Sequence, residues 1–265
     1  MKKDYWALIL GASSGFGADA ACLFAQEGCK VVLTARRIDK LRTLAEEIRS
    51  KGGVAEAIQM DVTDNEQIKK TVDEVIHEFG RVDILINNAG FGRLDWLENL
   101  EPIQDIETQI EVNLGGLILM TRTVLPYMIQ QGSGTIINMS SVAGRLAAPL
   151  YSVYAATKFG VRGFTEVLRR EVRPLGIQVS GIYPGGAATE FGSHTGNSAF
   201  RRNVKTPPWL RMTSGYVAKK IVSLAKNPKR SMVIPGWMSI AIWVDSHCPW
   251  LVDLAFSKMV RKYHH

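Results

Sequence analysis

WALILGASSGFG, residues 6–17, is a short apolar run that leads directly into a turn containing three glycines. Five consecutive apolar residues are typical of a strand buried on both faces, and residues 18–27 beyond the turn have the apolar spacing of a helix. Glycines at such a turn allow tight backbone geometry and let a pyrophosphate approach free N–H groups at the helix start. The stretch predicts a nucleotide-binding strand–turn–helix unit; a tight turn without a ligand is the alternative.

Strands and helices alternate along most of the remaining chain. Helical stretches such as residues 40–49 and 66–79 separate short apolar runs, which lie at residues 30–34, 54–60, 84–87, 135–139, 178–182 and 231–234. Parallel strands need crossover connections, and those connections are right-handed. The pattern predicts the α/β class: a doubly wound, Rossmann-like parallel sheet in a single domain with an apolar, basic C-terminal extension.

Size and charge divide the chain into two parts. Its 265 residues, 46% of them hydrophobic, suit one large α/β domain, which we expect over residues 1–230 with a mobile loop at about 191–211. A final strand and the extension occupy residues 231–265. The formal net charge of +7 is uneven, because residues 199–265 carry twelve basic and two acidic side chains.

Cysteine content and hydropathy indicate the compartment. The three cysteines, Cys22, Cys29 and Cys248, are too few for a disulfide framework, and the first residues lack the apolar core of a signal peptide. No run approaches the roughly 18 apolar residues needed to cross a bilayer. We therefore expect a cytoplasmic protein without a spanning helix.

Residues 11–15, GASSG, also match the G-x-S-x-G nucleophile elbow of α/β hydrolases. Only ten residues precede the motif, which leaves no room for the upstream strand and oxyanion loop of that fold. The base would have to be His194 or His247, and neither has independent support in the sequence. The hydrolase interpretation is therefore disfavoured.

The end of the second predicted strand indicates which cofactor is bound. NAD-preferring sites usually place an acid about 20 residues past the glycine turn, where it binds the ribose 2′-OH. This chain has Arg36 and Arg37 there, so no carboxylate repels a 2′-phosphate and the Arg36 guanidinium can bind one. NADP(H) is the predicted cofactor; solvated arginines at the start of a helix are the alternative.

Tyr154 and Lys158 are four residues apart and share one face if their segment is helical. A nearby cation favours a phenolate, so Lys158 is expected to lower the pKa of Tyr154 from its usual value near 10. The hydroxyl would then serve as a general acid or base. Taken alone, such a pair occurs by chance, and an exposed helical pair is the commoner explanation.

Together these motifs resemble the short-chain dehydrogenase/reductase (SDR) family over about residues 5–190. The shared features are the glycine turn, Asp61-Val62, residues 87–90 (NNAG), Asn113, Ser141 thirteen residues before Tyr154, and residues 183–189 (YPGGAAT). One departure is Leu10, at a position where the family commonly has threonine. Ser140 is the alternative to Ser141 as the family serine.

The resemblance implies a role for each of these residues. Ser141 would orient the substrate carbonyl and Tyr154 would donate the proton. Lys158 would assist Tyr154 and bind the nicotinamide ribose, while Asn113 would hold a water. The implied catalytic residues are Asn113, Ser141, Tyr154 and Lys158. The implied cofactor contacts are Gly11, Ser13, Ser14, Gly15, Phe16, Gly17, Arg36, Arg37, Asp61, Val62, Asn88, Ala89, Gly90, Tyr154, Lys158, Pro184, Gly185 and Thr189.

The resemblance predicts an oxidoreductase that transfers hydride between NADP(H) and a small-molecule carbonyl or alcohol, without a metal. Specificity in the family depends on residues 143–150, Tyr151 and the loop at about 191–211, which are mostly apolar or aromatic here. They favour a fatty, steroid-like or other bulky ketone or aldehyde, although such residues could equally cover the core. The alternatives are a non-catalytic NADP-binding sensor or scaffold protein, and epimerisation or dehydration on the same fold.

The basic tail holds four of the six tryptophans: Trp209, Trp237, Trp243 and Trp250. The resemblance implies a homo-oligomer, a dimer or tetramer, and a tail rich in tryptophan favours a subunit interface. Contact with a membrane surface, and hence a peripheral membrane location, is the second interpretation. The charge also suits an acidic partner such as an acyl carrier protein or a coenzyme A thioester. Scattered basic residues without a recognisable module argue against nucleic acid.

Overall fold

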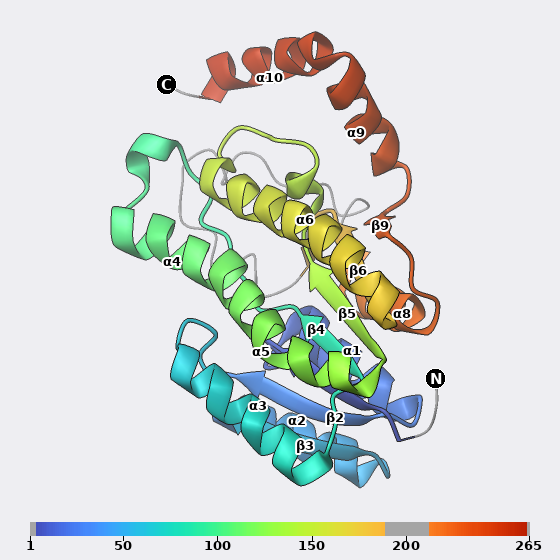
Figure 1. Ribbon diagram of the computed structural model, residues 1–265. Coiled ribbons are helices and arrows are strands. Elements are labelled where there is room, and N and C mark those ends of the chain that lie inside the picture. The colour runs from blue at the N-terminus through green and yellow to red at the C-terminus, as the bar shows by residue number, and fades with distance from the viewer. Residues whose placement is uncertain (1–3, 189–211, 264–265) are drawn as a thin grey trace.

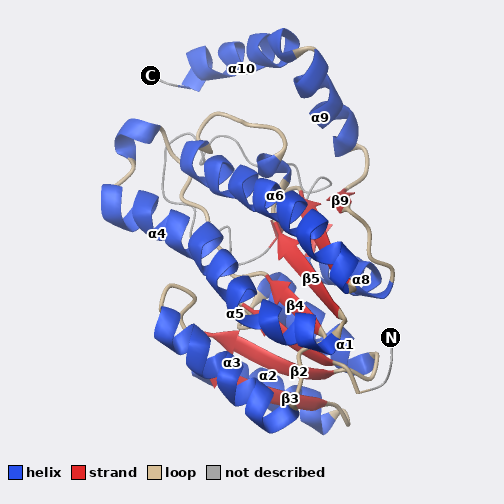
Figure 2. Cartoon of the chain, viewed as in Figure 1, coloured by secondary structure: helices blue, strands red, loops and turns tan. Residues whose placement is uncertain are grey.

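The computed structural model describes residues 4–188 and 212–263, and a seven-stranded parallel sheet lies at its centre (Figures 1 and 2). The strands, in spatial order, are β3 (Val54–Gln59), β2 (Lys30–Ala35), β1 (Trp6–Leu10), β4 (Ile84–Asn87), β5 (Gly134–Met139), β6 (Ile177–Pro184) and β9 (Ser231–Ile234). Every neighbouring pair is parallel. The predicted doubly wound sheet is confirmed, and strand ends differ from the predicted ones by two residues at most.

Helices cover both faces of the sheet. They are α1 (Gly15–Gln26), α2 (Ile38–Ser50), α3 (Asn65–Phe79), α5 (Gly116–Gln131), α6 (Ser152–Val172) and α8 (Ser214–Lys226). Strand β1 shows how the sequence produces this arrangement, because successive side chains of a strand point to opposite faces. Ala7 and Ile9 enter one core with residues of α1, α2 and α8. Leu8 and Leu10 enter the other with residues of α3, α5 and α6, which lie on the near face in Figure 1.

The strand order reverses between β1 and β4, since β2 and β3 continue to one side of β1 while β5, β6 and β9 continue to the other. Doubly wound sheets bind ligands beyond the carboxyl ends of the strands at this point. The glycine turn of residues 11–17 follows β1, and Asn88, Ala89 and Gly90 follow β4. The fold therefore brings two predicted cofactor-binding segments to the same crevice.

Residues 102–131 form one long helical segment between β4 and β5. It begins with the π-helical turn η2 (Pro102–Glu107), passes through α4 (Thr108–Ile110) and a second π-helical turn, η3 (Glu111–Gly115), and ends in α5. Contrary to the sequence analysis, this segment is long and apolar enough to cross a membrane by length and composition. Its buried residues Met120, Val124 and Met128 pack into the core beside α3 and the sheet, as in a core helix of this fold.

The chain leaves the sheet after β9 and continues as α9 (Met238–His247) and α10 (Pro249–Tyr263), which lie apart from the helical layers in Figure 1. Before that, β7 (Ala187–Ala188) pairs with β8 (Met212–Thr213), so the two ends that flank residues 189–211 lie side by side. The predicted mobile loop at about 191–211 lies outside the described residues.

Candidate active site

The glycine turn after β1 adopts backbone conformations that require glycine. Gly11 and Gly15 have φ angles of +67° and +57°, in the left-handed region. A Cβ on Gly17 would lie 2.5 Å from the carbonyl oxygen of Gly11, and one on Gly11 would lie 2.8 Å from the Cα of Ala89. The turn therefore folds tightly against the end of β4, and any side chain in place of these glycines would force the segments apart.

The start of α1 is open to an anion. The N-cap residue, Ser14, makes no side-chain capping hydrogen bond, and the first turn contains no acidic residue. The first N–H groups of a helix lack intrahelical partners, and its dipole favours negative charge there. This donor set fits the pyrophosphate of a dinucleotide, as predicted for Gly11, Ser13, Ser14, Gly15, Phe16 and Gly17.

Asn88 ties the end of β4 to the glycine turn. Its side-chain amide donates to the carbonyl oxygens of Leu10 and Gly11, both at 3.1 Å. The bonds fix the turn relative to the neighbouring segment, in which Ala89 touches the core and Gly90 lies beside Lys158. A Cβ on Gly90 would lie 2.9 Å from Asn113 Oδ1 and 3.4 Å from Lys158 Nζ. The predicted contacts of residues 88–90 are thus brought next to the predicted catalytic residues.

The two arginines after β2 behave differently. Arg37 reaches over the glycine turn, where its Nη2 donates to the hydroxyls of Ser13 and Ser14 at 2.9 Å and its Nε donates to Ser13 at 3.2 Å. The Arg36 side chain is 74% exposed and lies 4.0 Å from Asp61, at the end of β3. The structure therefore places Arg37 directly on the turn, whereas the sequence prediction emphasised Arg36. Beside Asp61, Val62 packs against Gly116.

Tyr154 and Lys158 lie one turn apart near the start of α6, and both are buried. Lys158 Nζ is 5.6 Å from the centroid of the Tyr154 ring and donates to the Met139 carbonyl oxygen at 3.1 Å. Met139 is the last residue of β5, so the pair lies at the carboxyl end of the sheet. The predicted adjacency of phenol and ammonium is present.

The two serines that follow β5 have separate tasks. Ser140 is buried and donates to the backbone carbonyl of Lys158 at 2.9 Å, which fixes α6 against β5. Ser141 caps the short turn η4 (Val142–Gly144), where its hydroxyl accepts from the Ala143 N–H at 3.1 Å and donates to the Pro184 carbonyl at 3.3 Å. Ser141 is also hydrogen-bonded to Tyr154. The structure thus favours Ser141 over Ser140 as the site serine.

Asn113 lies in the π-helical turn η3 and is fully buried. Its Oδ1 accepts from the Phe91 N–H at 2.9 Å and its Nδ2 donates to the Phe91 carbonyl at 2.7 Å. Nδ2 also lies 3.3 Å from the hydroxyl of Thr157, on α6. The side-chain amide therefore links the segment after β4 to α6, and both its oxygen and its nitrogen are hydrogen-bonded.

Burial shifts the pKa of both central groups toward their neutral forms. Burial raises the pKa of Tyr154 well above its usual range, and Tyr151 adds a smaller increase. The hydrogen bond with Ser141 lowers this pKa but does not offset the effect of burial. Burial also lowers the pKa of Lys158 from 10.5 to about 8. The predicted lowering of the Tyr154 pKa is wrong for this arrangement, because desolvation of the phenol is the largest contribution, and the ammonium is itself desolvated and bonded to Met139.

The segment after β6 closes the site. Pro184 accepts the hydrogen bond from Ser141, and the Gly185 N–H donates to the Ile234 carbonyl at 2.7 Å. A Cβ on Gly185 would lie 2.6 Å from the sulfur of Met238, in the first turn of α9. The C-terminal extension therefore begins at the candidate site. Thr189, another predicted cofactor contact, lies outside the described residues.

Gly144 lies in the predicted specificity segment, residues 143–150, but its role in packing the site was not predicted. A Cβ at this position would lie 2.5 Å from the Lys158 carbonyl oxygen and 2.6 Å from Ser140 Oγ. Gly144 thus permits η4 and α6 to approach closely enough for Ser141 to reach Tyr154. Its place three residues after Ser141 was the only available signal, and spacing alone does not reveal a close backbone contact.

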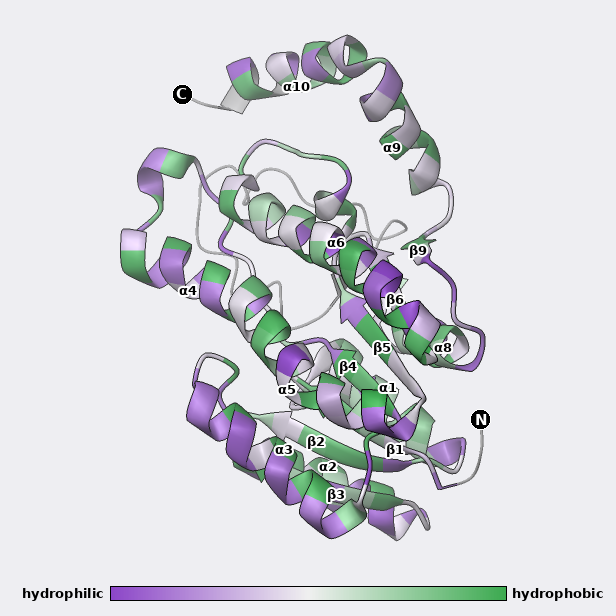
Figure 3. Ribbon diagram, viewed as in Figure 1, coloured by the Kyte–Doolittle hydropathy of each residue, from purple (hydrophilic) through white to green (hydrophobic). Residues whose placement is uncertain are grey.

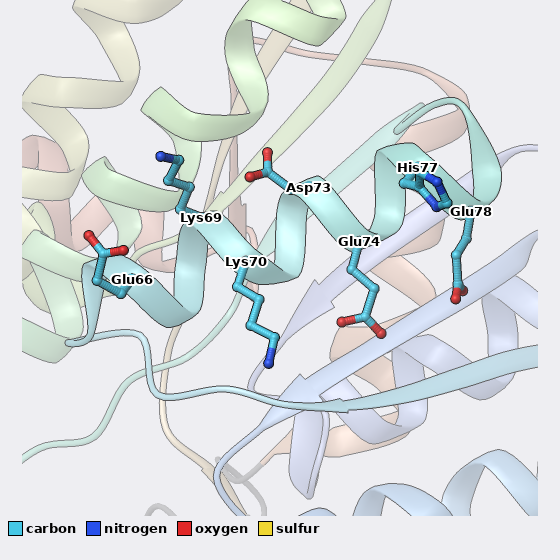
Figure 4. Close-up of a pocket in the computed structure, with 7 residues that line it drawn as sticks. All are labelled: Glu66, Lys69, Lys70, Asp73, Glu74, His77 and Glu78. Carbon is cyan, nitrogen blue, oxygen red and sulfur yellow. The ribbon is translucent and has the colours of Figure 1, made fainter.

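The outer surface of α3 lacks this convergence of groups. Figure 4 shows a depression on α3 whose lining residues, Glu66, Lys69, Lys70, Asp73, Glu74, His77 and Glu78, include none of the predicted site residues. In residues 4–188 and 212–263 there is no group of three or more His, Cys, Asp or Glu side chains that could hold a metal ion. The hydroxyl of Ser13, the nucleophile of the hydrolase alternative, is bonded to Arg37, while His247 lies on α9 and His194 is outside the described residues.

Comparison with known proteins gives one consistent result. A family model described as short chain dehydrogenase matches residues 5–198. The chain is 39% identical over 178 residues to a 3-oxoacyl-acyl-carrier-protein reductase of Thermotoga maritima, covering 67% of this chain and 72% of the relative. It is 33% identical over 263 residues to 11-beta-hydroxysteroid dehydrogenase A of Sesamum indicum, covering 95% and 74%.

Solved structures agree with the sequence relatives. The chain is similar to the crystal structure of a variant of actinorhodin polyketide ketoreductase with NADPH, with a TM-score of 0.78 and 30% identity. The similarity covers 88% of this chain and 96% of the ketoreductase chain. It therefore spans most of this chain.

Proposed function

The chain belongs to the short-chain dehydrogenase/reductase family, whose members are oxidoreductases of carbonyl and alcohol groups, and from this premise we propose that it reduces bulky lipophilic ketones or aldehydes with NADPH. One observation carries the proposal. The buried phenol of Tyr154 is hydrogen-bonded to Ser141 and lies one helical turn from Lys158, at the strand ends where the glycine turn would hold a dinucleotide.

Each side chain has a definite task in this reaction. NADPH, when bound, supplies the hydride that reaches the carbonyl carbon. The Ser141 hydroxyl, which donates to the Pro184 carbonyl in this structure, would turn its proton to the substrate carbonyl oxygen and hold that oxygen beside Tyr154. The Tyr154 hydroxyl gives its proton to that oxygen, so the product is a neutral alcohol. Lys158, when protonated, stabilises the phenolate that remains until a proton returns from solvent.

The direction of the Tyr154 pKa shift suits reduction. A proton donor must hold its proton before the reaction begins. The phenol is protonated at neutral pH at its ordinary pKa near 10, and burial raises that pKa further. The Tyr154 phenol would give up its proton only as negative charge develops on the substrate oxygen and makes that oxygen the better base. The site therefore favours transfer of the Tyr154 proton to the substrate in the transition state. Loss of that proton to water before the reaction is disfavoured.

Two arginines support NADPH over NADH. Arg36 and Arg37 follow β2, where an NAD-preferring site would place a carboxylate, and Arg37 already spans the two serines of the glycine turn. A planar guanidinium binds phosphate with two parallel hydrogen bonds. The structural relative that was solved with NADPH supports the same cofactor.

Apolar and aromatic residues in the segment before Tyr154 support a lipophilic substrate. Leu150 is buried, and the ring of Tyr151 lies 6.1 Å from that of Tyr154 at a tilt of 60°. These residues belong to the segments on which specificity in the family depends. The relatives named for a 3-oxoacyl group, a hydroxysteroid and a polyketide support this class of substrate.

The proposal is tested by Tyr154→Phe, with Tyr216→Phe on α8 as the control at an exposed tyrosine. The assay is NADPH oxidation with a panel of ketones and aldehydes graded by size and hydrophobicity. Tyr154→Phe is expected to lower kcat by roughly 10²–10⁴-fold while NADPH binding persists. Full turnover in Tyr154→Phe, or NADPH binding without turnover of any carbonyl by the wild type, contradicts the proposal.

A further inference from the structure

Helices α9 and α10 expose large apolar side chains. Trp237, Trp243 and Trp250 are 54%, 57% and 65% exposed, and Ile240 is 68% exposed. Within residues 4–188 and 212–263, these are the only tryptophans that are more than half exposed. Among the described residues, the exposed tryptophans are thus concentrated in one short segment beyond the sheet.

Helix α9 is largely apolar on every side of its first two turns, and its polar residues Asp245, Ser246 and His247 lie at its end. Apart from Ser239, residues 238–244 are all apolar, yet none of the helix is buried. Figures 1 and 3 show α9 and α10 standing off from the domain although hydrophobic residues recur along both. The helices pack on each other, and α9 packs on β9. A helix that is hydrophobic on all sides is normally surrounded by protein or by lipid.

The charge of α10 distinguishes between these two surroundings. Trp250, Leu251 and Leu254 share one face with Lys258 and Arg261, because the spacings of four and three residues keep that face. The face is therefore apolar in its first turns and basic in its last. Tryptophan at the headgroup level with lysine and arginine beside the phosphates is the pattern of a helix on an anionic membrane.

We propose that residues 237–261 dock this protein on the surface of an anionic phospholipid membrane. A flat protein surface would cover one side of α9, whereas the outer layer of a bilayer surrounds an apolar helix on most sides. The basic end of α10 matches negative headgroups, a complementarity that a second copy of the same basic segment would lack. The structure thus favours lipid over the subunit interface that the sequence analysis preferred.

Docking would also orient the active site. Ile234, the last residue of β9, pairs with Pro184, and Met238 in α9 touches Gly185. The extension therefore starts at the strand ends that carry the candidate site, and docking holds that edge of the sheet toward the bilayer. Resting on the proposed function, this arrangement delivers a lipophilic carbonyl from the membrane to Tyr154.

The test measures binding of the full-length protein to vesicles by co-sedimentation and by tryptophan fluorescence. Vesicles of phosphatidylcholine with phosphatidylglycerol are compared with pure phosphatidylcholine, each at low and high salt. The wild type is expected to bind the anionic vesicles, more tightly at low salt. The double variant Trp243→Ala/Trp250→Ala is expected to bind about a hundredfold more weakly, at about tenfold for each lost side chain.

A matched pair of substitutions provides the control. Ile240 and Ile103 are both 68% exposed, but only Ile240 lies in the extension. Ile240→Glu should weaken vesicle binding and Ile103→Glu should not. The proposal is overturned if the wild type does not bind anionic vesicles, or if both glutamates weaken binding equally. It is also overturned if Ile240→Glu halves the molecular mass in solution without any vesicle binding by the wild type, because a second copy then covers the helices.

Turnover of a water-soluble ketone separates this proposal from the proposed function. The tryptophan variants are expected to oxidise NADPH with such a ketone as fast as the wild type. Absent turnover in every protein would contradict the proposed function, and the vesicle measurements would still decide the docking.

Discussion

Replacing Lys158 by methionine is expected to stabilise the fold while removing activity. The wild-type ammonium is buried at the end of β5, and its pKa falls from 10.5 to about 8. Each tenfold change in a protonation equilibrium corresponds to about 1.4 kcal/mol, so keeping Lys158 charged at pH 7 costs about 3 kcal/mol of folding free energy. Losing the hydrogen bond to Met139 returns about 1 kcal/mol of that, and a net gain of about 2 kcal/mol remains.

The gain depends on pH with a definite sign. Below pH 8 both the folded and the unfolded wild type carry the proton, and the full cost is present. Between about pH 8 and 10.5 the unfolded chain binds more protons than the folded one, so the free energy of unfolding of the wild type rises with pH. Lys158→Met lacks this titration. Its advantage is therefore expected to shrink above pH 8 and to disappear by about pH 10.

Urea unfolding of both proteins at pH 7 and pH 10 measures the effect, with Lys70→Met on the outer face of α3 as the control. The midpoint of Lys158→Met should exceed that of the wild type at pH 7 and match it at pH 10, while Lys70→Met should follow the wild type at both. Equal midpoints at pH 7, or a difference between the midpoints that does not change with pH, would refute the conclusion that the buried Lys158 ammonium destabilises the fold.

Three further substitutions probe other contacts. Arg37→Ala removes charge-assisted hydrogen bonds worth about 1.5–3 kcal/mol. We expect it to lower kcat/KM with NADPH by about 10–100-fold and to change kcat/KM with NADH little. An unaltered preference for NADPH over NADH would exclude Arg37 from phosphate binding. Asp83→Ala removes the buried carboxylate that accepts hydrogen bonds from Arg81 and from the Trp6 N–H. It should lower the free energy of unfolding, measured in urea, by about 3 kcal/mol. Asp83→Asn should lower it less, because the amide keeps an acceptor. Gly144→Ala places a Cβ against the Lys158 carbonyl and should lower the free energy of unfolding by about 1–3 kcal/mol. It should also lower kcat of the protein that remains folded. A normal kcat would show that η4 can shift without disturbing the site.

The sheet could be predicted from the sequence because a parallel strand covered on both faces must be apolar at nearly every position. Runs such as residues 6–10 and 84–87 therefore stand out against the amphipathic helices between them. The segment at residues 102–115 was not foreseen, since its π-helical turns break the 3.6-residue period on which the interpretation depends. Asn113 lies in one of these turns, so its contact with Phe91 could not be derived from spacing.

Sequence spacing predicted which site residues would meet, but not how their surroundings would act on them. Four residues along a helix suffice to place Tyr154 beside Lys158. Whether the ammonium lowers the phenol pKa depends on burial and on the partner of the ammonium. That partner, the Met139 carbonyl at the end of β5, is 19 residues from Lys158, and no helical spacing predicts the contact. The same limit applies to Arg36 and Arg37. Their neighbouring positions do not reveal that only Arg37 points toward the serines of the glycine turn.

Burial of Tyr154 and Lys158 explains why the site needs so many supporting contacts. Each group loses hydration, so each pKa moves toward the neutral form, and the pair becomes reactive only in a geometry that lets proton and charge shift together. Ser140 holds the backbone of α6, Asn113 braces Phe91 and Thr157, and Gly144 admits η4 into contact with Lys158. None of these residues needs to touch a substrate to matter. Their removal would let water reach Lys158, raise its pKa and weaken the field that makes the Tyr154 proton transferable.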